Sequence, residues 1–487
     1  MKQVKLFLLT VLIVVFCSCL NAAEKPNVIV ILVDDMGWMD LSCQGSDYYK
    51  TPAIDSIAEG GMRFTNGYAA CAVCSPTRAA VQTGRYPHRV GLTDYIRHRF
   101  YIGRRPLKEN PTKYTGGRNQ KVLCPPNPYW MEHEEITIAE ALKEAGYKSG
   151  YIGKWHLGDP DWYPEGQGYD VNRGGCFYGQ PPSYFDPYNK PKSKHESLRN
   201  GIYNLPPRKP GEYLTYREAD EAETLIRKWH AEKQPFFLHV SHYAVHTPIQ
   251  AIEEVAAKYK RKGKNDTNAK YAAMVESVDD STEQILSTVK ELGIEKNTIV
   301  IFTSDNGGLD TKGRPTDNAP LRSGKGFPYE GGIRVPFMVR WPGVIPEGKI
   351  SDQPVCSIDI FPTILEAVGV KLPEGRAIDG LSFLDHFKSG GKSDIDRDEL
   401  LWHFPHYRYG SRPYSIIRKG DLKLIKYWTG GYELFDLSTD LSEENNLADK
   451  MPEKVKQLDA VLMKRLAAGN AKLPRKNPAY VPKEKNK

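Results

Sequence analysis

The stretch Asn27-Val28-Ile29-Val30-Ile31-Leu32-Val33 is apolar after its first residue, and Asp34-Asp35 follows it directly. An uninterrupted β-branched run is typical of a strand buried on both faces of a mostly parallel sheet. In open α/β sheets, ligands bind beyond the carboxyl ends of the strands, which is where these two aspartates lie. Adjacent carboxylates repel each other unless a cation neutralises them, so the pair indicates a hard metal ion. The alternative is a helix N-cap with a spare charge.

A second strand of the same kind is expected at Asn297–Thr303, and Ser304-Asp305-Asn306-Gly307-Gly308 follows it. Asp305 and Asn306 add two oxygen ligands at this second strand end. Oxygen ligands suit calcium or magnesium better than a thiophilic metal. The two strand ends together therefore predict a site for a hard divalent cation.

The segment Cys74-Ser75-Pro76-Thr77-Arg78 predicts the start of a helix, with Ser75 as N-cap, Pro76 at the first helical position and Gly84 as the stop. Cys74 would then lie at the positive end of the helix dipole, one turn from Arg78. Such a position binds anions and favours an anionic nucleophile. The alternative is a buried structural cysteine that precedes an ordinary helix.

Three further segments place cationic or titratable side chains after predicted strands or in a glycine-rich loop. Lys154 and His156 follow a short strand at 149–152, and the alternation of side chains puts them on one side with Trp155 on the other. His246 follows a strand at 235–240, and glycines flank Lys325, which allows the backbone to approach an anion closely. Lys154 and His156, taken alone, are also compatible with ordinary surface positions.

The order of these segments predicts an α/β protein with a large mixed, mostly parallel sheet flanked by helices. After about residue 390 the pattern changes to short strands that alternate with turns, followed by a charged helix at 453–466. This predicts a small C-terminal antiparallel α+β subdomain. We therefore divide the chain into a signal segment at 1–23, a catalytic domain at 24–390 and a C-terminal subdomain at 391–487.

The N-terminus has the features of a secretory signal peptide. Two lysines precede an apolar run at 6–16, which is too short to span a membrane, and small residues follow as far as Ala23. Cys19 lies in a poor match to a lipoprotein cleavage site, so a lipid anchor is an open alternative. No later transmembrane segment is expected. We expect an exported protein that is periplasmic, extracellular or a surface lipoprotein.

Composition narrows the class of partner. The chain has 487 residues and a formal net charge of +7, a mild excess that is compatible with an anionic substrate. No run of Lys and Arg is dense enough to predict a nucleic-acid partner. Of the eight cysteines, Cys17 and Cys19 lie in the signal segment, and the spacing of the others matches no complete zinc site.

Six short blocks, in this order along the chain, resemble the type I, formylglycine-dependent sulfatases of the alkaline phosphatase superfamily, and especially the bacterial exported carbohydrate sulfatases. Two positions depart slightly from the family pattern, Thr77 where Ser is commoner and Gln82 where Leu is commoner. The blocks are Asp34-Asp35, Cys74-Ser75-Pro76-Thr77-Arg78, Gly153-Lys154-Trp155-His156, His246-Thr247-Pro248, Ser304-Asp305-Asn306-Gly307 and Gly324-Lys325.

The resemblance implies an alkaline-phosphatase-like fold and a formylglycine made from Cys74 by a maturation enzyme. It implies one calcium ion, held by Asp34, Asp35, Asp305, Asn306 and residue 74. The hydrated aldehyde would attack sulfur, with Asp305 helping to remove its proton. The resemblance further implies that Arg78, Lys154 and Lys325 neutralise the sulfate, that His246, alone or with Lys325, protonates the leaving oxygen, and that His156 acts as base when the aldehyde re-forms.

The implied substrate is a sulfated polysaccharide or oligosaccharide. Two stretches, 241–248 and 181–185, resemble subgroups that act on 4-sulfated galactose or N-acetylgalactosamine. Two other functions remain open at this point. One is a phosphoester or phosphonate hydrolase of the same superfamily, and the other is a non-catalytic protein that binds sulfated glycans if Cys74 is never converted.

Overall fold

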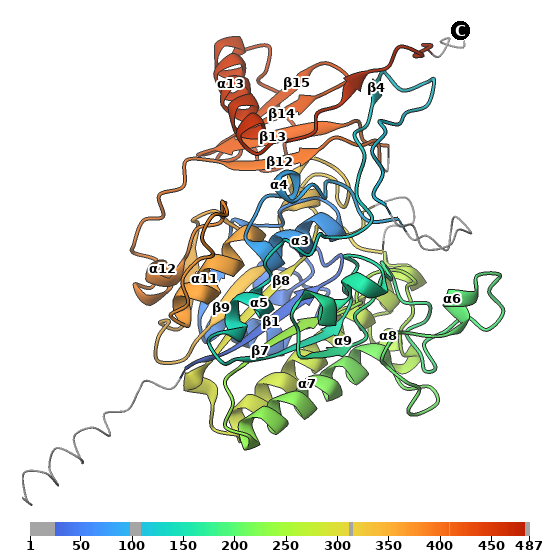
Figure 1. Ribbon diagram of the computed structural model, residues 1–487, viewed down its shortest axis with the longest axis vertical. Helices are drawn as coiled ribbons and strands as arrows, with labels where there is room; N and C mark the ends of the chain where they lie inside the picture. The colour runs from blue at the N-terminus through green and yellow to red at the C-terminus, as the bar shows by residue number, and fades with distance from the viewer. Residues whose placement is uncertain (1–24, 98–108, 311–314, 409, 483–487) are drawn as a thin grey trace, which may run out of the picture.

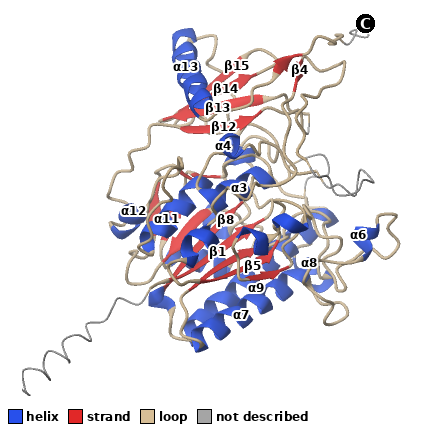
Figure 2. Cartoon of the chain, viewed as in Figure 1, coloured by secondary structure: helices blue, strands red, loops and turns tan. Residues whose placement is uncertain are grey.

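The computed structural model describes residues 25–97, 109–310, 315–408 and 410–482. The predicted signal peptide and Cys19 lie outside these ranges. Helices enclose a large sheet in the lower part of the molecule, and a smaller sheet lies above it (Figures 1 and 2). Within the described ranges, no helix is both long and apolar enough to cross a membrane.

The large sheet has eight strands, and β1 lies in its interior between two parallel neighbours, β7 and β8. The pairs β5–β7, β5–β6 and β10–β2 are also parallel, whereas β9 runs antiparallel to β2 and β8. The predicted mixed, mostly parallel sheet is confirmed. In spatial order the strands are β10 (Lys349–Ser351), β2 (Met62–Phe64), β9 (Phe337–Arg340), β8 (Thr298–Ser304), β1 (Asn27–Val33), β7 (Phe236–Ser241), β5 (Lys148–Gly153) and β6 (Val171–Arg173).

Helices cover both faces of this sheet. The long helices α7 (Leu214–Ala231) and α9 (Asp266–Glu291) pack against each other below it, and α3 (Cys74–Thr83) and α11 (Ile360–Ala367) lie above it (Figure 1). Every residue of β1 is buried, as its apolar sequence predicts. The sheet therefore lies between two helical layers, and its carboxyl edge is the place where loops converge.

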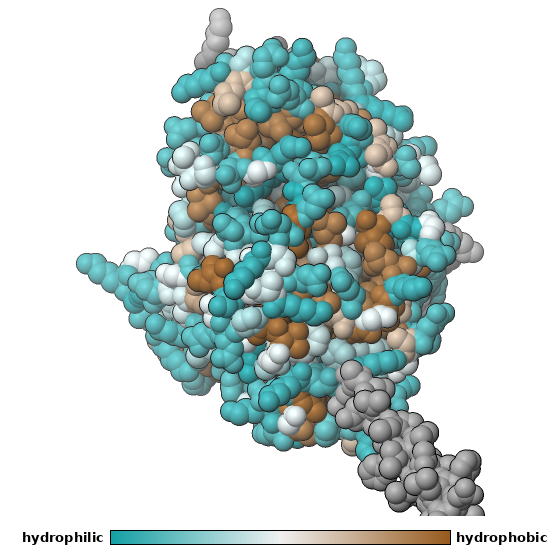
Figure 3. Space-filling view, turned by 90° about the vertical axis from the view of Figure 1, so that its left-hand side faces the viewer, coloured by the Kyte–Doolittle hydropathy of each residue, from teal (hydrophilic) through white to brown (hydrophobic). Residues whose placement is uncertain are grey.

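A second sheet occupies the C-terminal part. Its four antiparallel strands are β12 (Leu400–Phe404), β13 (Tyr414–Lys419), β14 (Leu422–Tyr427) and β15 (Tyr432–Asp436). Helix α13 (Pro452–Ala468) covers this sheet and buries Val455, Leu458, Leu462 and Leu466, which lie three or four residues apart. Seen from one side, the molecular surface is mainly hydrophilic, with hydrophobic areas that include one in the upper part (Figure 3). The predicted antiparallel subdomain is confirmed, while its boundary at residues 390 and 391 stays a prediction.

The start of α3 differs from the prediction. The helix begins at Cys74 with Val73 as its N-cap, so Ser75 lies inside the first turn and the prediction that it caps the helix was wrong. The Ser75 hydroxyl instead donates to the carbonyl of His156 at 2.9 Å and accepts from the N–H of Ile96 at 3.0 Å. Gly84 ends the helix in the left-handed conformation, φ 67°, as predicted.

Candidate active site

The carboxyl ends of neighbouring strands deliver the predicted residues to one edge of the sheet. Asp34 and Asp35 follow β1, and Asp305 follows β8. The N–H of Asp305 donates to the carbonyl of Val33, and the N–H of Asp35 donates to a carboxylate oxygen of Asp305 at 3.2 Å. The loop after β7, which carries His246, joins the same edge through backbone hydrogen bonds to Asp34. Parallel pairing of β1, β7 and β8 thus brings together residues that are up to 271 positions apart.

The oxygen atoms at this edge fit a hard metal ion. Asp34, Asp35 and Asn306 are fully buried or nearly so, and each has one side-chain oxygen (Oδ1, Oδ2 and Oδ1, respectively) without a hydrogen-bond partner among the described residues. The Asn306 amide donates to Asp35 Oδ1 at 2.8 Å, which orients its own oxygen. Buried polar atoms are almost always satisfied, so three unsatisfied oxygens in one place indicate a cation ligand set.

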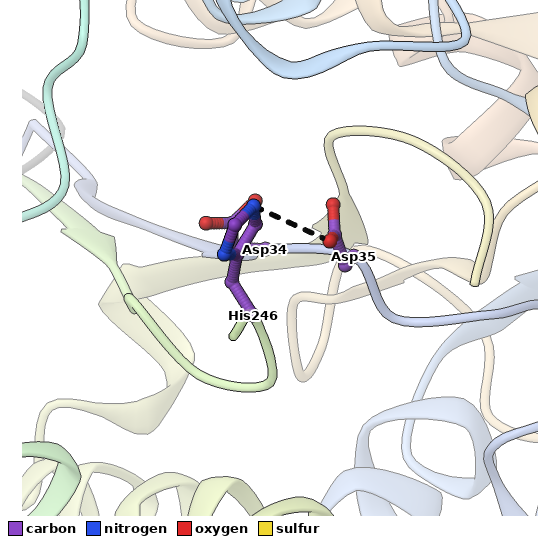
Figure 4. Close-up of side chains that lie close together, drawn as sticks. All are labelled: Asp34, Asp35 and His246. Atoms are coloured by element: carbon purple, nitrogen blue, oxygen red, sulfur yellow. Dashed lines mark ion pairs between the residues drawn. The ribbon is translucent and has the colours of Figure 1, made fainter. Parts of the chain in front are cut away.

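Two sets of side chains could each hold a metal ion, because the ligand atoms within a set lie within 4.8 Å of one another. One set is Asp34, Cys74 and Asp305, and the other is Asp34, Asp35 and His246. In the second set, the imidazole of His246 comes from the loop after β7 and faces Asp35, with 3.5 Å between Nε2 and Oδ2 (Figure 4). The first set contains the cysteine that sequence analysis assigned as a metal ligand after conversion. Four of the five predicted ligands therefore appear in these two sets, and Asn306 contacts one of them.

Two buried lysines balance the carboxylates. Lys154 Nζ lies 2.5 Å from Asp34 Oδ2, and Lys325 Nζ lies 2.5 Å from Asp35 Oδ1. Burial and the neighbouring Asp305 raise the pKa of Asp34 well above its usual range. Burial also opposes ionisation of Asp35, but Lys325 and His246 outweigh it and hold the pKa of this carboxyl below its usual range. The site therefore combines anionic ligands for a cation with cationic groups for an anion.

Cys74 lies between these groups at the first position of α3 and is 3% exposed. Its Sγ is 3.9 Å from Lys325 Nζ. Burial raises the pKa of the thiol, and this effect exceeds the opposing effect of Lys154 and Lys325. Burial therefore outweighs the neighbouring lysines for the unmodified thiol, and the expectation that this helix N-terminus favours an anionic nucleophile stays a prediction.

Arg78 is buried and braces three strand ends. Its Nε donates to Asp305 at 2.8 Å, and its Nη1 donates to the carbonyl of Lys154 and to the Ser241 hydroxyl, each at 2.6 Å. Sequence analysis predicted a contact between Arg78 and sulfate, which stays a prediction. The bracing role was not foreseen, because nothing in the sequence indicates that Ser241 and the Lys154 carbonyl meet on one guanidinium group.

His156 lies next to the start of α3 in the left-handed conformation, φ 57°. Its Nε2 is 2.8 Å from the carbonyl of Ile96. A carbonyl can only accept, so Nε2 carries the proton and Nδ1 is the basic nitrogen of the neutral ring. Trp155 is fully buried and packs edge to face against Tyr151.

His246 is fixed by its own loop. Its Nδ1 is 2.9 Å from the carbonyl of Thr247, so Nδ1 donates and Nε2 is the atom that faces Asp35. Burial, together with Lys325, lowers the pKa of His246 to about 3. The Tyr184 hydroxyl donates to the carbonyl of His246 at 2.8 Å, a contact that sequence analysis missed. No sequence signal marks it, because the two residues are 62 positions apart.

Comparisons with known proteins agree with this geometry. Residues 26–370 match the family model described as sulfatase, and residues 323–472 match the one described as N-sulphoglucosamine sulphohydrolase, C-terminal. The chain is 33% identical over 443 residues to N-acetylgalactosamine-6-sulfatase of Mus musculus, covering 88% of this chain and 77% of that one. It is 32% identical to a sulfatase of Formosa agariphila, with coverage of 89% and 86%. The crystal structure of Ps i-CgsB in complex with k-i-k-neocarrahexaose has a TM-score of 0.77 and 29% identity, with coverage of 92% and 94%.

Proposed function

Since this chain belongs to the sulfatase family and hydrolyses sulfate esters, we propose that it removes O-sulfate from a carbohydrate by means of a formylglycine made from Cys74. The observation that carries the proposal is the position of Cys74, at a helix N-terminus beside Lys325 and within one ligand set with Asp34 and Asp305. Cys74 thus provides a nucleophile, Lys325 a contact for an anion, and Asp34 and Asp305 ligands for a cation, all close to one another.

We assign the cation position to one calcium ion, held by Asp34, Asp35, Asp305, Asn306 and residue 74. Once bound, the ion supplies positive charge that stabilises the charge developing on the reacting sulfate group. The unsatisfied oxygens of Asp34, Asp35 and Asn306 support this assignment. Arg78 supports it indirectly, because its bond to Asp305 fixes the direction of that carboxylate.

Lys154 and Lys325 are the cations for the sulfate oxygens. Both ammonium groups are buried at the site, so their interaction with an anion is little screened by water. Asp305 accepts the proton of the attacking hydroxyl. The formylglycine hydrate provides that hydroxyl, and a maturation enzyme must form the aldehyde.

The two histidines handle the remaining protons. His246 exposes Nε2 to the site. Burial, and after it Lys325, lowers the pKa of this ring, and an anionic ester beside Lys325 opposes the second of these effects. We assign the ring the transfer of a proton to the leaving oxygen. His156 has Nδ1 as its basic nitrogen and receives the proton when the aldehyde re-forms. Loss of that proton forms the C=O bond of the aldehyde and breaks the bond between its carbon and the sulfate oxygen, which releases sulfate. Addition of water to the aldehyde then restores the hydrate.

The substrate is proposed to be a sulfated galactose or N-acetylgalactosamine unit of a glycan. The curated relatives named N-acetylgalactosamine-6-sulfatase support the 6-position, whereas the stretches 241–248 and 181–185 predict the 4-position. We also retain the predicted export of the mature protein, because glycan polymers are found outside the cytoplasm. Cell fractionation of the native host tests this localisation.

The test is sulfate release from a panel of 2-, 3-, 4- and 6-sulfated galactose and N-acetylgalactosamine, with aryl sulfate and aryl phosphate as reference esters. The protein is co-expressed with a maturation enzyme, and mass spectrometry of the Cys74 peptide verifies the aldehyde. We expect sulfate release from one sugar position and aryl sulfate turnover that exceeds aryl phosphate turnover. Preference for aryl phosphate would establish the phosphoester hydrolase instead, and binding without release would establish the glycan-binding protein.

A further inference from the structure

Lys325 reaches the site from a glycine-rich segment, residues 321–332, which we call the lysine loop. The N–H of Lys325 donates to the carbonyl of Gly308, and the N–H of Gly326 donates to the carbonyl of Ala72. The loop folds tightly on itself, since a Cβ at Gly331 would lie 2.2 Å from the carbonyl oxygen of Ser323. The position of the Lys325 ammonium group, 2.5 Å from Asp35 and 3.9 Å from Cys74, therefore depends on where the whole loop lies.

A turn that follows β15 contacts the lysine loop near both of its ends. At the start, the Ser442 hydroxyl donates to the carbonyl of Pro320 at 2.8 Å, and Arg322 donates to the carbonyl of Glu443 at 2.6 Å. At the other end, the N–H of Glu330 donates to the carboxylate of Glu443 at 2.6 Å. Glu443 is fully buried and adopts the left-handed conformation, φ 53°. One turn thus fixes the spacing between the two ends of the loop.

A buried lysine of the C-terminal sheet completes this contact. Lys423, on β14, lies 2.9 Å from the carboxylate of Glu330 and 2.7 Å from that of Glu443. All three side chains are fully buried. The hydroxyl of Tyr68 donates to the second oxygen of Glu330 at 2.7 Å. Arg334 also pairs with Glu330, at 3.3 Å, so Lys423 is the cation that links the two carboxylates to each other.

We propose that Glu443 and Lys423 are positioning residues, through which the C-terminal sheet holds the lysine loop so that Lys325 lies at Asp35 and Cys74. Neither residue touches the site, and both act through Glu330 and the ends of the loop. The kinetic part of this inference rests on the proposed function, in which Lys325 binds sulfate. The structural part, that the turn after β15 holds residues 321–332 in one conformation, does not depend on that function.

The experiment compares Glu443→Ala with Glu443→Gln in the full-length, aldehyde-containing protein. Gln keeps an oxygen that can accept from the N–H of Glu330, whereas Ala keeps none. The matched control is Lys426→Met. Lys426 lies on β14, the strand that carries Lys423, and pairs with Asp459 of α13, away from the lysine loop. Three quantities are measured: amide hydrogen exchange of residues 321–332, kcat/KM for an aryl sulfate, and inhibition by inorganic sulfate.

We expect Glu443→Ala to accelerate exchange in residues 321–332, to lower kcat/KM by about tenfold or more, and to weaken inhibition by sulfate, because a displaced catalytic group loses most of its effect. Glu443→Gln should restore most of each value, and Lys426→Met should leave all three unchanged. Ser442→Ala is a milder change and should alter the same three quantities in the same direction by smaller amounts. This variant replaces Glu443→Ala in the test if Glu443→Ala fails to fold.

Unchanged exchange in residues 321–332 of the variant that folds would overturn the proposal, as would equal losses in Lys426→Met. If the wild-type protein releases no sulfate although its aldehyde is verified, the proposed function fails. Hydrogen exchange then still decides whether the turn holds the loop, because this measurement does not depend on turnover.

Discussion

At the residue scale, the site is a balanced set of buried charges. Asp34 and Asp35 each face one lysine, and each keeps one oxygen without a hydrogen-bond partner among the described residues. A substitution that removes the charge of either carboxylate removes its ion pair with a lysine and weakens it as a metal ligand. Substitutions at the site are therefore expected to change calcium binding before they change the fold.

Asp34→Asn should lower the affinity for calcium by about tenfold or more, because one charged ligand is lost and Lys154 loses its partner. Isothermal titration of the calcium-free protein measures this change. Asp40→Asn is the control, since the Asp40 carboxylate already accepts from the N–H of Gly37 and the hydroxyl of Tyr271. Equal affinities in the Asp34 variant and the wild type would contradict the assignment of Asp34 as a ligand.

The contacts of Gln82 explain why this position departs from the family pattern, in which Leu is commoner. Its carbonyl oxygen accepts from Tyr169, and its amide nitrogen is 3.1 Å from Nδ1 of His239, which is therefore the unprotonated nitrogen. Burial lowers the pKa of His239 to about 3. The ring is neutral in the folded protein, whereas it titrates near pH 6.5 in the unfolded chain.

The pH dependence of stability follows from this pKa. Because the folded-state pKa is depressed, the stabilisation by His239 is present above pH 6.5 and is lost as the pH falls toward 3, by about 1 kcal/mol per pH unit. His239→Gln should therefore differ from the wild type less at pH 5 than at pH 7. Urea unfolding at the two pH values measures the difference, and an equal difference at both would contradict a neutral, buried ring.

At the scale of elements, the ends of strands and helices decide where the site lies. The apolar runs predicted β1 and β8, and parallel pairing then placed the residues that follow them at one edge. Sequence analysis could not predict the contacts between elements. Ser75 was assigned as an N-cap from local rules, but its hydroxyl forms its bonds with residues 96 and 156, which only the folded chain brings near.

Helix α3 provides a test at this scale. Gly84 has φ 67°, and a Cβ there would lie 3.0 Å from side-chain atoms of both Phe361 and Ile378. Gly84→Ala should therefore lower the free energy of unfolding by more than about 1 kcal/mol, from backbone strain and crowding together. Gly91→Ala is the matched control, because Gly91 also has a positive φ, 87°, but a Cβ there meets nothing within 4 Å. Equal losses in urea unfolding would show that crowding at the end of α3 is unimportant.

At the scale of the whole molecule, buried charges join the C-terminal part to the lysine loop. Lys423 and Glu443 of the C-terminal part contact Glu330, which lies near the end of the lysine loop. The sequence predicted both sheets, but not this connection. Periodicity and turn signals report local structure, whereas residues 330, 423 and 443 meet only in the folded chain, where β14 and the turn after β15 contact the lysine loop.

The most direct test of the central claim relates turnover to the chemical state of residue 74. Preparations with graded maturation are analysed for the aldehyde fraction by mass spectrometry, and each is assayed for sulfate release from an aryl sulfate. We predict that kcat per protein molecule rises in proportion to the aldehyde fraction and falls to zero in Cys74→Ala. Turnover that is independent of the aldehyde fraction, or that persists in Cys74→Ala, would contradict the mechanism.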